Sequence, residues 1–290
     1  MSEDEALDLV EDGMTVALGG FNTAAHPMTI VRGLVRRGVR GLRVIGSTIA
    51  GLDLDLLIGA GVAEEVVTSS VTGEAAASVG PFFRDGAERG SVRVWESDEG
   101  ILYAGLRAAG QGLPFLPWKA GVGSSLPELN PDLKVFHDPV AGEQLLAVPA
   151  LEPDIAFIHV ARADVHGLGQ HEGSGFGDRL LHRAAKRTVI TTERLVPNEA
   201  IRARASETSI PYADGVVVAR WGAHPFSSPG HYLVDERHLR EYVAAATSAR
   251  KGDRGPFEAY LERHVTGPSS HVEYLETIGI RRLLELEEWG

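Results

Sequence analysis

The chain has 290 residues, of which 43% are hydrophobic and 23% charged, and its formal net charge at pH 7 is −12. This composition is that of an ordinary globular protein with enough length for one large domain or two. The acidic balance argues against a nucleic-acid-binding protein, which needs a basic surface, although an anionic small molecule can still bind at backbone amides and local arginines.

The absence of cysteine excludes disulfides, thiolate nucleophiles and thiolate metal ligands. No apolar run approaches the roughly 20 residues that a membrane-spanning helix needs. Three of the first five residues are acidic and none is basic, so the start lacks the basic region of a secretory signal. We therefore expect a cytoplasmic protein that binds neither nucleic acid nor membrane.

The first predicted strand covers residues 15–18, where a continuous apolar run is typical of a strand buried on both faces. Gly19 and Gly20 follow directly, at a point where the backbone bends sharply or comes close to a ligand. Ligands bind at the carboxyl ends of the strands in open α/β sheets, so this elbow (residues 19–22) is a candidate binding site. The alternative is a tight turn with no ligand.

Further apolar runs predict six more strands, separated by segments with helical spacing, of which 27–37, 52–60 and 101–109 are the clearest. Repeated strand–helix alternation predicts an α/β fold with an open, mostly parallel sheet flanked by helices. The six predicted strands are 42–46, 65–69, 92–95, 155–160, 188–192 and 215–219.

Two regions depart from this alternation. Five prolines lie in the stretch from about 112 to 140, which we interpret as an ordered, loop-rich excursion. From about 236 to 290 the chain is helical, and this segment either caps the same domain or covers a second protein chain. We predict one domain over residues 1–290.

Several polar or glycine positions are candidate site residues. Ser47 and Ser69 each lie at the end of a predicted strand, where they either contact a ligand or cap a helix. Gly121 and Gly123 either present amides to a phosphate or an oxyanion, or form a tight turn.

Three histidines, His159, His166 and His171, lie near Asp164. Such side chains can ligate zinc, but their spacing matches no known ligand template. We favour ordinary hydrogen-bonded histidines and predict no metal site.

The stretch from Asp12 to Pro27 resembles the signature of the alpha chains of family I coenzyme A transferases. The matching residues are Asp12, Gly13, Val16, Ala17, Leu18, Gly19, Gly20, Phe21 and Pro27, whereas Ala25 stands where the family has glycine. Alanine is disfavoured there if the position has a positive φ. Five more segments are similar to glutaconate-type alpha chains: 51–61, 112–117, 126–133, 148–151 and 222–225.

The resemblance implies a CoA-transferase/NagB-like fold and the alpha half of a heteromeric enzyme. Such enzymes move coenzyme A between an acyl-CoA and a carboxylic acid, here a dicarboxylic or 3-oxo acid. The substrate is a coenzyme A thioester, no cofactor is bound permanently, and the partner is a beta subunit in an αβ or α2β2 assembly. In glutaconate-type enzymes the nucleophilic glutamate belongs to the beta subunit. This chain would then supply pocket walls, for which we nominate Gly19, Gly20, Phe21 and Asn22 together with the serines and glycines named above.

Relatives of the same family open a ring of a coenzyme A thioester by hydrolysis and place a catalytic glutamate on the alpha chain. The matching position is Glu99 in the Glu99-Gly100 pair, with Glu96 as a weaker candidate. Glu99 either acts as a base or serves as an acidic first-turn residue of the helix that follows. A third reading, from a different class, is a non-catalytic small-molecule binding domain.

Overall fold

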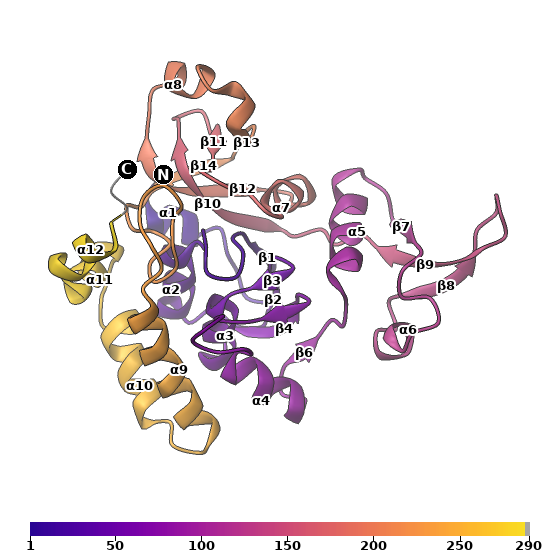
Figure 1. Ribbon diagram of the computed structural model, residues 1–290, viewed down its shortest axis with the longest axis horizontal. Helices are drawn as coiled ribbons and strands as arrows, with labels where there is room; N and C mark the ends of the chain where they lie inside the picture. The colour runs from indigo at the N-terminus through magenta and orange to yellow at the C-terminus, as the bar shows by residue number, and fades with distance from the viewer. Residues whose placement is uncertain (288–290) are drawn as a thin grey trace.

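The main sheet of the computed structural model, which describes residues 1–287, contains seven parallel strands. Their order across the sheet is β14 (Gly215–Val218), β12 (Thr188–Leu195), β10 (Ile155–Ala163), β1 (Thr15–Leu18), β2 (Leu42–Ile45), β4 (Ala63–Val67) and β6 (Arg93–Val94). All seven runs predicted as strands occur in this sheet. The predicted fold class, an open mostly parallel sheet flanked by helices, is confirmed (Figure 1).

Two hydrophobic clusters cover the two faces of the sheet, which explains why residues 16–18 of β1 and 155–158 of β10 are continuous apolar runs. Val16 and Leu18 of β1 face one cluster, and Ala17 between them faces the other. The first cluster is built with α1 (Glu3–Leu7), α2 (Met28–Arg37), α3 (Leu52–Gly59) and α4 (Pro81–Arg89), and the second with α5 (Glu99–Gly110) and α7 (Asp178–Ala184).

Short strands elaborate the carboxyl side of the sheet. The loops that follow β2 and β4 pair with each other through β3 (Ile49–Ala50) and β5 (Ser70–Val71). Two antiparallel strands, β11 (Gly169–Gln170) and β13 (Thr208–Ile210), extend from the far end of β10, with α8 (Asn198–Arg202) and a 3₁₀ turn between β12 and β13.

The stretch that we expected to be loop-rich contains regular structure. β7 (Phe115–Trp118), β8 (Lys134–His137) and β9 (Gln144–Pro149) form an antiparallel sheet in the order β7-β9-β8, with α6 (Leu126–Leu129) between β7 and β8. Figure 1 shows this three-stranded arm on the side of α5 away from the main sheet. Pro117 lies in an edge strand of the arm, where a missing backbone N–H is tolerated.

The C-terminal segment is helical, as predicted. It comprises α9 (Glu236–Arg250), α10 (Gly255–Leu261), a π-helical turn (Glu262–Thr266), α11 (His271–Ile278) and α12 (Ile280–Leu286). Residues 288–290, the end of the predicted helical segment, lie outside the described residues. None of the described helices is both long and apolar enough to cross a membrane.

Candidate functional site

The carboxyl ends of β1, β2 and β4 lie side by side and bring three predicted site segments to one edge of the sheet. The elbow follows β1, Ser47 follows β2 and Ser69 follows β4. The Asn22 amide donates to the Ile49 carbonyl at 2.8 Å, and the Ser69 amide donates to the Thr48 carbonyl at 3.1 Å. The elbow and both loops therefore form one connected surface.

The elbow is held rigidly by its own amides. The Gly19 amide donates to the Phe157 carbonyl at 2.8 Å, and the Gly20 amide donates to Oδ1 of Asp178 at 3.0 Å. The Phe21 amide donates to the Ala24 carbonyl at 2.9 Å. Since the Asn22 amide is also used, no backbone amide of the elbow is free to bind an oxyanion. Contact of Gly19, Gly20, Phe21 and Asn22 with a ligand stays a prediction.

Gly20 is required for that shape. It has φ +95°, and a Cβ placed on it would lie 2.8 Å from the carbonyl carbon and oxygen of Ala25. The next residue, Phe21, stacks on Phe176 with ring centroids 4.4 Å apart. A side chain at Gly20 would force the elbow to open.

Ala25, the departure from the family signature, has φ +58° and so adopts the left-handed conformation that glycine tolerates best. Its amide donates to the Ser227 carbonyl at 2.8 Å, and the residue is 4% exposed. The surrounding contacts thus hold alanine in a conformation that costs it energy.

His26 and Asp53 form a buried pair that holds the end of the elbow in place. Nδ1 of His26 lies 2.9 Å from Oδ2 of Asp53, and both side chains are buried. Nε2 of His26 lies 3.1 Å from the Asn22 carbonyl. This pair links the end of the elbow to the first turn of α3.

Ser47 and Ser69 use their hydroxyls within their own loops. Ser47 Oγ donates to the Ile49 carbonyl at 2.8 Å, and Ser69 Oγ donates to the Thr48 carbonyl. Neither serine caps a helix. Both stabilise the β3–β5 pairing, and their contact with a ligand stays a prediction.

Glu99 is the first residue of α5, and its side chain is exposed. The cap of this helix is Asp98, whose Oδ1 accepts from the Ile101 amide at 2.7 Å. Within residues 1–287 nothing forms a hydrogen bond or ion pair with the Glu99 carboxylate. This chain alone therefore does not enclose Glu99, and its catalytic role stays a prediction.

Gly121 and Gly123 lie in the arm rather than beside the elbow. Both have positive φ, +87° and +79°, in a turn whose Gly121 carbonyl accepts from the Ser124 amide at 3.2 Å. A Cβ on Gly121 would lie 3.0 Å from Leu146 of β9. The turn explains both glycines structurally, and anion binding there stays a prediction.

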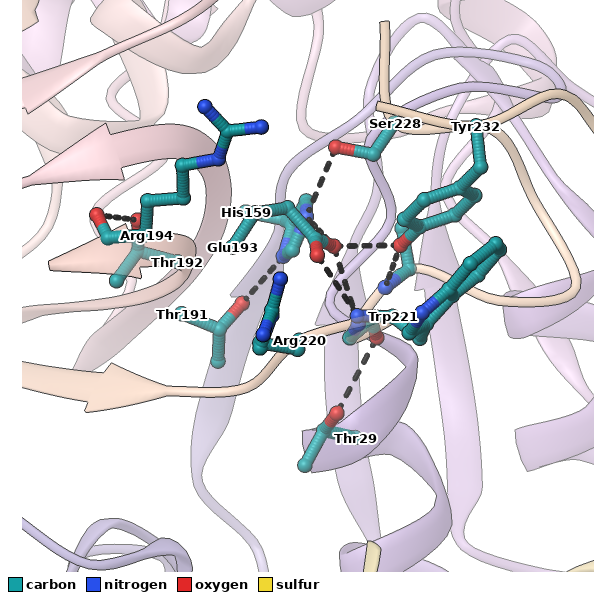
Figure 2. Close-up of polar contacts among 12 residues, drawn as sticks. Thr29, His159, Thr191, Thr192, Glu193, Arg194, Arg220, Trp221, Ser228 and Tyr232 are labelled. Carbon is teal, nitrogen blue, oxygen red and sulfur yellow. Dashed lines mark hydrogen bonds and ion pairs between the residues drawn. The ribbon is translucent and has the colours of Figure 1, made fainter. Parts of the chain in front are cut away.

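A buried polar cluster is formed by residues of β10, of β12 and of the segment that follows β14 (Figure 2). Glu193, 4% exposed, lies 3.0 Å from Nε2 of His159, and its Oε1 accepts from the Tyr232 hydroxyl at 2.6 Å. Its Oε2 accepts from the Trp221 amide at 2.7 Å. We name these residues the Glu193 cluster.

The contacts in the Glu193 cluster shift two pKa values in opposite directions. Burial disfavours the Glu193 carboxylate, but the hydrogen bond and charge of His159, together with the hydrogen bonds from Tyr232 and Trp221, outweigh it and hold the pKa of Glu193 below its ordinary value. Burial and the neighbouring Glu193 charge raise the pKa of Tyr232 well above its ordinary value. Sequence reasoning missed the cluster because its members lie on separate elements; the one available signal was the polar run 191–193 that continues an apolar strand.

The three histidines near Asp164 do not converge. His159 lies within β10 and its Nδ1 is 3.0 Å from the Thr191 hydroxyl. His166 is exposed, and Asp164 Oδ1 accepts from its amide at 2.9 Å. His171 contacts Asp178 instead. Among residues 1–287 no group of three or more His, Cys, Asp or Glu side chains is arranged to hold a metal ion.

Known proteins have sequences similar to that of this chain. The chain is 38% identical over 98% of its length to an uncharacterized protein of Archaeoglobus fulgidus, of which it spans only 63%. It is 35% identical to the cholesterol ring-cleaving hydrolase IpdA subunit of Mycobacterium tuberculosis, over 84% of this chain and 87% of that protein.

The corresponding chain of the glutaconate CoA-transferase from Acidaminococcus fermentans is 30% identical over 98% of this chain and 93% of its own length. The crystal structure of that transferase superposes with a TM-score of 0.92, covering 100% of this chain and 95% of the matched chain. The family model described as coenzyme A transferase matches residues 1–219. The family resemblance that residues 12–27 indicated is thus confirmed over the whole fold. The chain belongs to the coenzyme A transferase family.

Proposed function

We propose that this chain is the alpha subunit of a heteromeric coenzyme A transferase, which moves coenzyme A between an acyl-CoA and a carboxylic acid. The observation that carries the proposal is the rigid elbow at the carboxyl edge of a parallel sheet, in a chain that superposes on a glutaconate CoA-transferase with a TM-score of 0.92. The acyl groups are those of dicarboxylic or 3-oxo acids.

The chemistry divides between two different chains. The nucleophile is a glutamate of the beta subunit, which attacks the thioester carbonyl, and the resulting mixed anhydride is cleaved by the released thiolate to give a glutamyl-CoA thioester and the free acid. The acceptor carboxylate then reverses these steps. A carboxylate is a weak nucleophile until water is excluded from it, so the beta subunit must close over the edge that this chain leaves exposed.

The first test is chemical trapping on the assembled enzyme. The chain is co-purified with its beta subunit, incubated with acetyl-CoA or glutaconyl-CoA, and treated with borohydride, which reduces a glutamyl thioester to an alcohol. We expect the modification on one glutamate of the beta subunit, with none on this chain. An unmodified beta subunit in a complex that still consumes the thioester would overturn the proposal.

The second candidate is a coenzyme A thioester hydrolase on the same scaffold, with Glu99 as the base. It is favoured by the 35% identity to a chain of the ring-cleaving hydrolase and by the free, exposed carboxylate of Glu99. Glu99→Gln should then lower hydrolysis by about 100-fold or more. The matched control is Glu96→Gln, which removes a second exposed carboxylate three residues earlier. A transferase would still form its adduct on the beta subunit in Glu99→Gln.

The remaining expectations belong to the same proposal. The enzyme works in the cytoplasm as an αβ or α2β2 assembly and holds no permanent cofactor. Native mass spectrometry of the co-purified complex tests both the stoichiometry and the absence of a bound cofactor.

A further inference from the structure

A serine, a histidine and an aspartate form a hydrogen-bonded chain beside the elbow. Nδ1 of His171 lies 2.6 Å from Oγ of Ser209, and Nε2 of His171 lies 2.9 Å from Oδ2 of Asp178. His171 directly follows β11, Ser209 lies in the paired strand β13, and Asp178 begins α7. All three side chains are buried, with Ser209 7% exposed and Asp178 1% exposed.

The hydrogen-bond partners of His171 determine which of its ring nitrogens carries a proton. Because a carboxylate only accepts, the contact with Asp178 places a proton of His171 on Nε2 and leaves Nδ1 as an acceptor. For the Ser209 hydroxyl, Nδ1 at 2.6 Å is a nearer acceptor than the Gly169 carbonyl at 3.3 Å. The other oxygen of Asp178 accepts from the Gly20 amide at 3.0 Å, so the aspartate is anchored independently of the histidine. A nucleophile, a base within hydrogen-bond reach and a group that orients the base are the parts needed to activate a serine.

The serine and histidine open onto a hollow of about 600 Å³. The loop 173–175 lines it, and a Cβ placed on Gly175 would lie 3.2 Å from Nδ1 of His171, so this backbone passes directly over the imidazole. The amides of Gly173, Ser174 and Gly175 donate to no group within residues 1–287. Unpaired amides beside a nucleophile are suited to stabilise an oxyanion. Arg179 and Arg204 line the same hollow, but so do Glu172 and Glu207, and Glu207 lies 3.8 Å from Arg204. The lining therefore carries balanced charge and selects for no anionic substrate.

From these contacts we infer that Ser209 and His171 form a second catalytic site, which hydrolyses small acyl esters or thioesters independently of any partner chain. His171 Nδ1 takes the proton of Ser209 as Oγ bonds to the acyl carbon. The carbon–sulfur or carbon–oxygen bond then breaks, and the leaving group takes that proton from Nδ1. Water attacks the acyl-serine, gives its proton to Nδ1, and releases the acid as Ser209 Oγ regains a proton. Asp178 is a positioning residue in this scheme.

The test uses the full chain purified alone, with a fluorophosphonate probe and p-nitrophenyl acetate. We expect one covalent adduct, located by mass spectrometry on Ser209, and hydrolysis of the ester that disappears in Ser209→Ala. In His171→Ala the labelling rate should fall by about 100-fold or more. The matched control is Ser206→Ala, an exposed serine three residues earlier, which should label like the wild type.

Folding of each variant is checked by circular dichroism and by the midpoint of thermal unfolding. Asp178 is left unchanged because its loss would also release the elbow. Ser209→Cys provides a second readout, since a cysteine activated by His171 should accept an acetyl group from acetyl-CoA. No adduct on Ser209 in the folded chain, or equal labelling of the wild type and His171→Ala, would overturn the inference. Neither result depends on the beta subunit, so the transferase proposal is tested separately.

Discussion

At the scale of single residues, the backbone at Ala25 shows how a family signature can lose a glycine without losing its shape. The residue keeps φ +58° although it carries a methyl group, because its amide is bonded to the Ser227 carbonyl and the elbow closes around it. Asn22, three residues earlier, has φ +56°, a conformation that asparagine tolerates better than most residues.

Ala25→Gly should change the free energy of unfolding by less than about 1 kcal/mol, because relief of the left-handed conformation is offset by a lost methyl contact and a more flexible unfolded chain. Ala25→Val should cost about 2 kcal/mol or more, since a β-branched residue at positive φ is strained. Urea denaturation followed by circular dichroism measures both. Ala24→Val, at a neighbour without positive φ, is the control, and equal losses at the two positions would contradict the argument.

Glu193→Gln should destabilise the protein by about 2–3 kcal/mol, because the amide nitrogen that replaces one oxygen cannot accept from the donors around it. The pKa of Glu193 is lowered in the folded protein, so its stabilising contribution is present above the unfolded value of 4.5 and is lost as the pH falls through the folded value. The difference in stability between wild type and variant should therefore shrink below pH 4.5. Urea titrations at pH 7 and at acidic pH test this, and a constant difference would refute it.

At the scale of elements, one buried carboxyl joins three helices. Asp55 of α3 accepts from the Phe83 amide of α4 at 2.7 Å and from the Tyr242 hydroxyl of α9 at 2.7 Å. Burial raises its pKa to about 6. Asp55 therefore stabilises the folded protein most when its carboxyl group is protonated.

Asp55→Asn replaces the carboxyl group between the three helices with an uncharged group of the same shape. The variant protein should become more stable relative to wild type as the pH rises. The sign follows from the raised pKa: the contribution of Asp55 is fully present below the unfolded value of 3.8 and is lost as the pH rises through about 6. Thermal unfolding of both proteins at pH 4, 5, 6 and 7 measures the trend. If the midpoint of thermal unfolding of the variant fell relative to that of wild type between pH 4 and pH 7, the ionised form of Asp55 would be the one that stabilises the fold.

Whether a strand or loop could be predicted from the sequence depended on how deeply it is buried. The central strands β1 and β10 were found because both of their faces are covered, which gives unbroken apolar runs at residues 16–18 and 155–158. Strands β2, β4 and β6 also carry charged side chains. The arm was missed because β7 is a short edge strand that contains Pro117, and proline normally indicates a loop. The elbow was found from local sequence, whereas Asp178, which holds Gly20, lies 158 residues away and needed the topology of the sheet.

At the scale of the whole molecule, the C-terminal helices share the main core. Tyr242, Phe257 and Tyr260 belong to the same hydrophobic cluster as β1, α2 and α3. Phe257 is fully buried, and its ring centroid lies 4.5 Å from that of Phe82 in α4. These contacts support our proposal that residues 1–290 form one domain.

Phe257→Ala should therefore destabilise the whole chain by about 3–5 kcal/mol, as expected for a large side chain removed from a core. Far-ultraviolet circular dichroism and tryptophan fluorescence should still report one shared transition in urea. Val272→Ala, on the 65% exposed Val272 of α11, is the control and should change stability by less than about 0.5 kcal/mol. Separate transitions by the two probes would indicate an independent C-terminal unit.

The hydrogen bond between Gly20 and Asp178 has a consequence for the growing chain on the ribosome. The elbow leaves the ribosome early, but the carboxylate that fixes it is made 158 residues later. At about 5–20 residues per second, that interval is on the order of 10–30 s, much longer than local folding needs. During translation the family's most recognisable segment therefore exists first without its shape, and it acquires that shape only when α7 has been made.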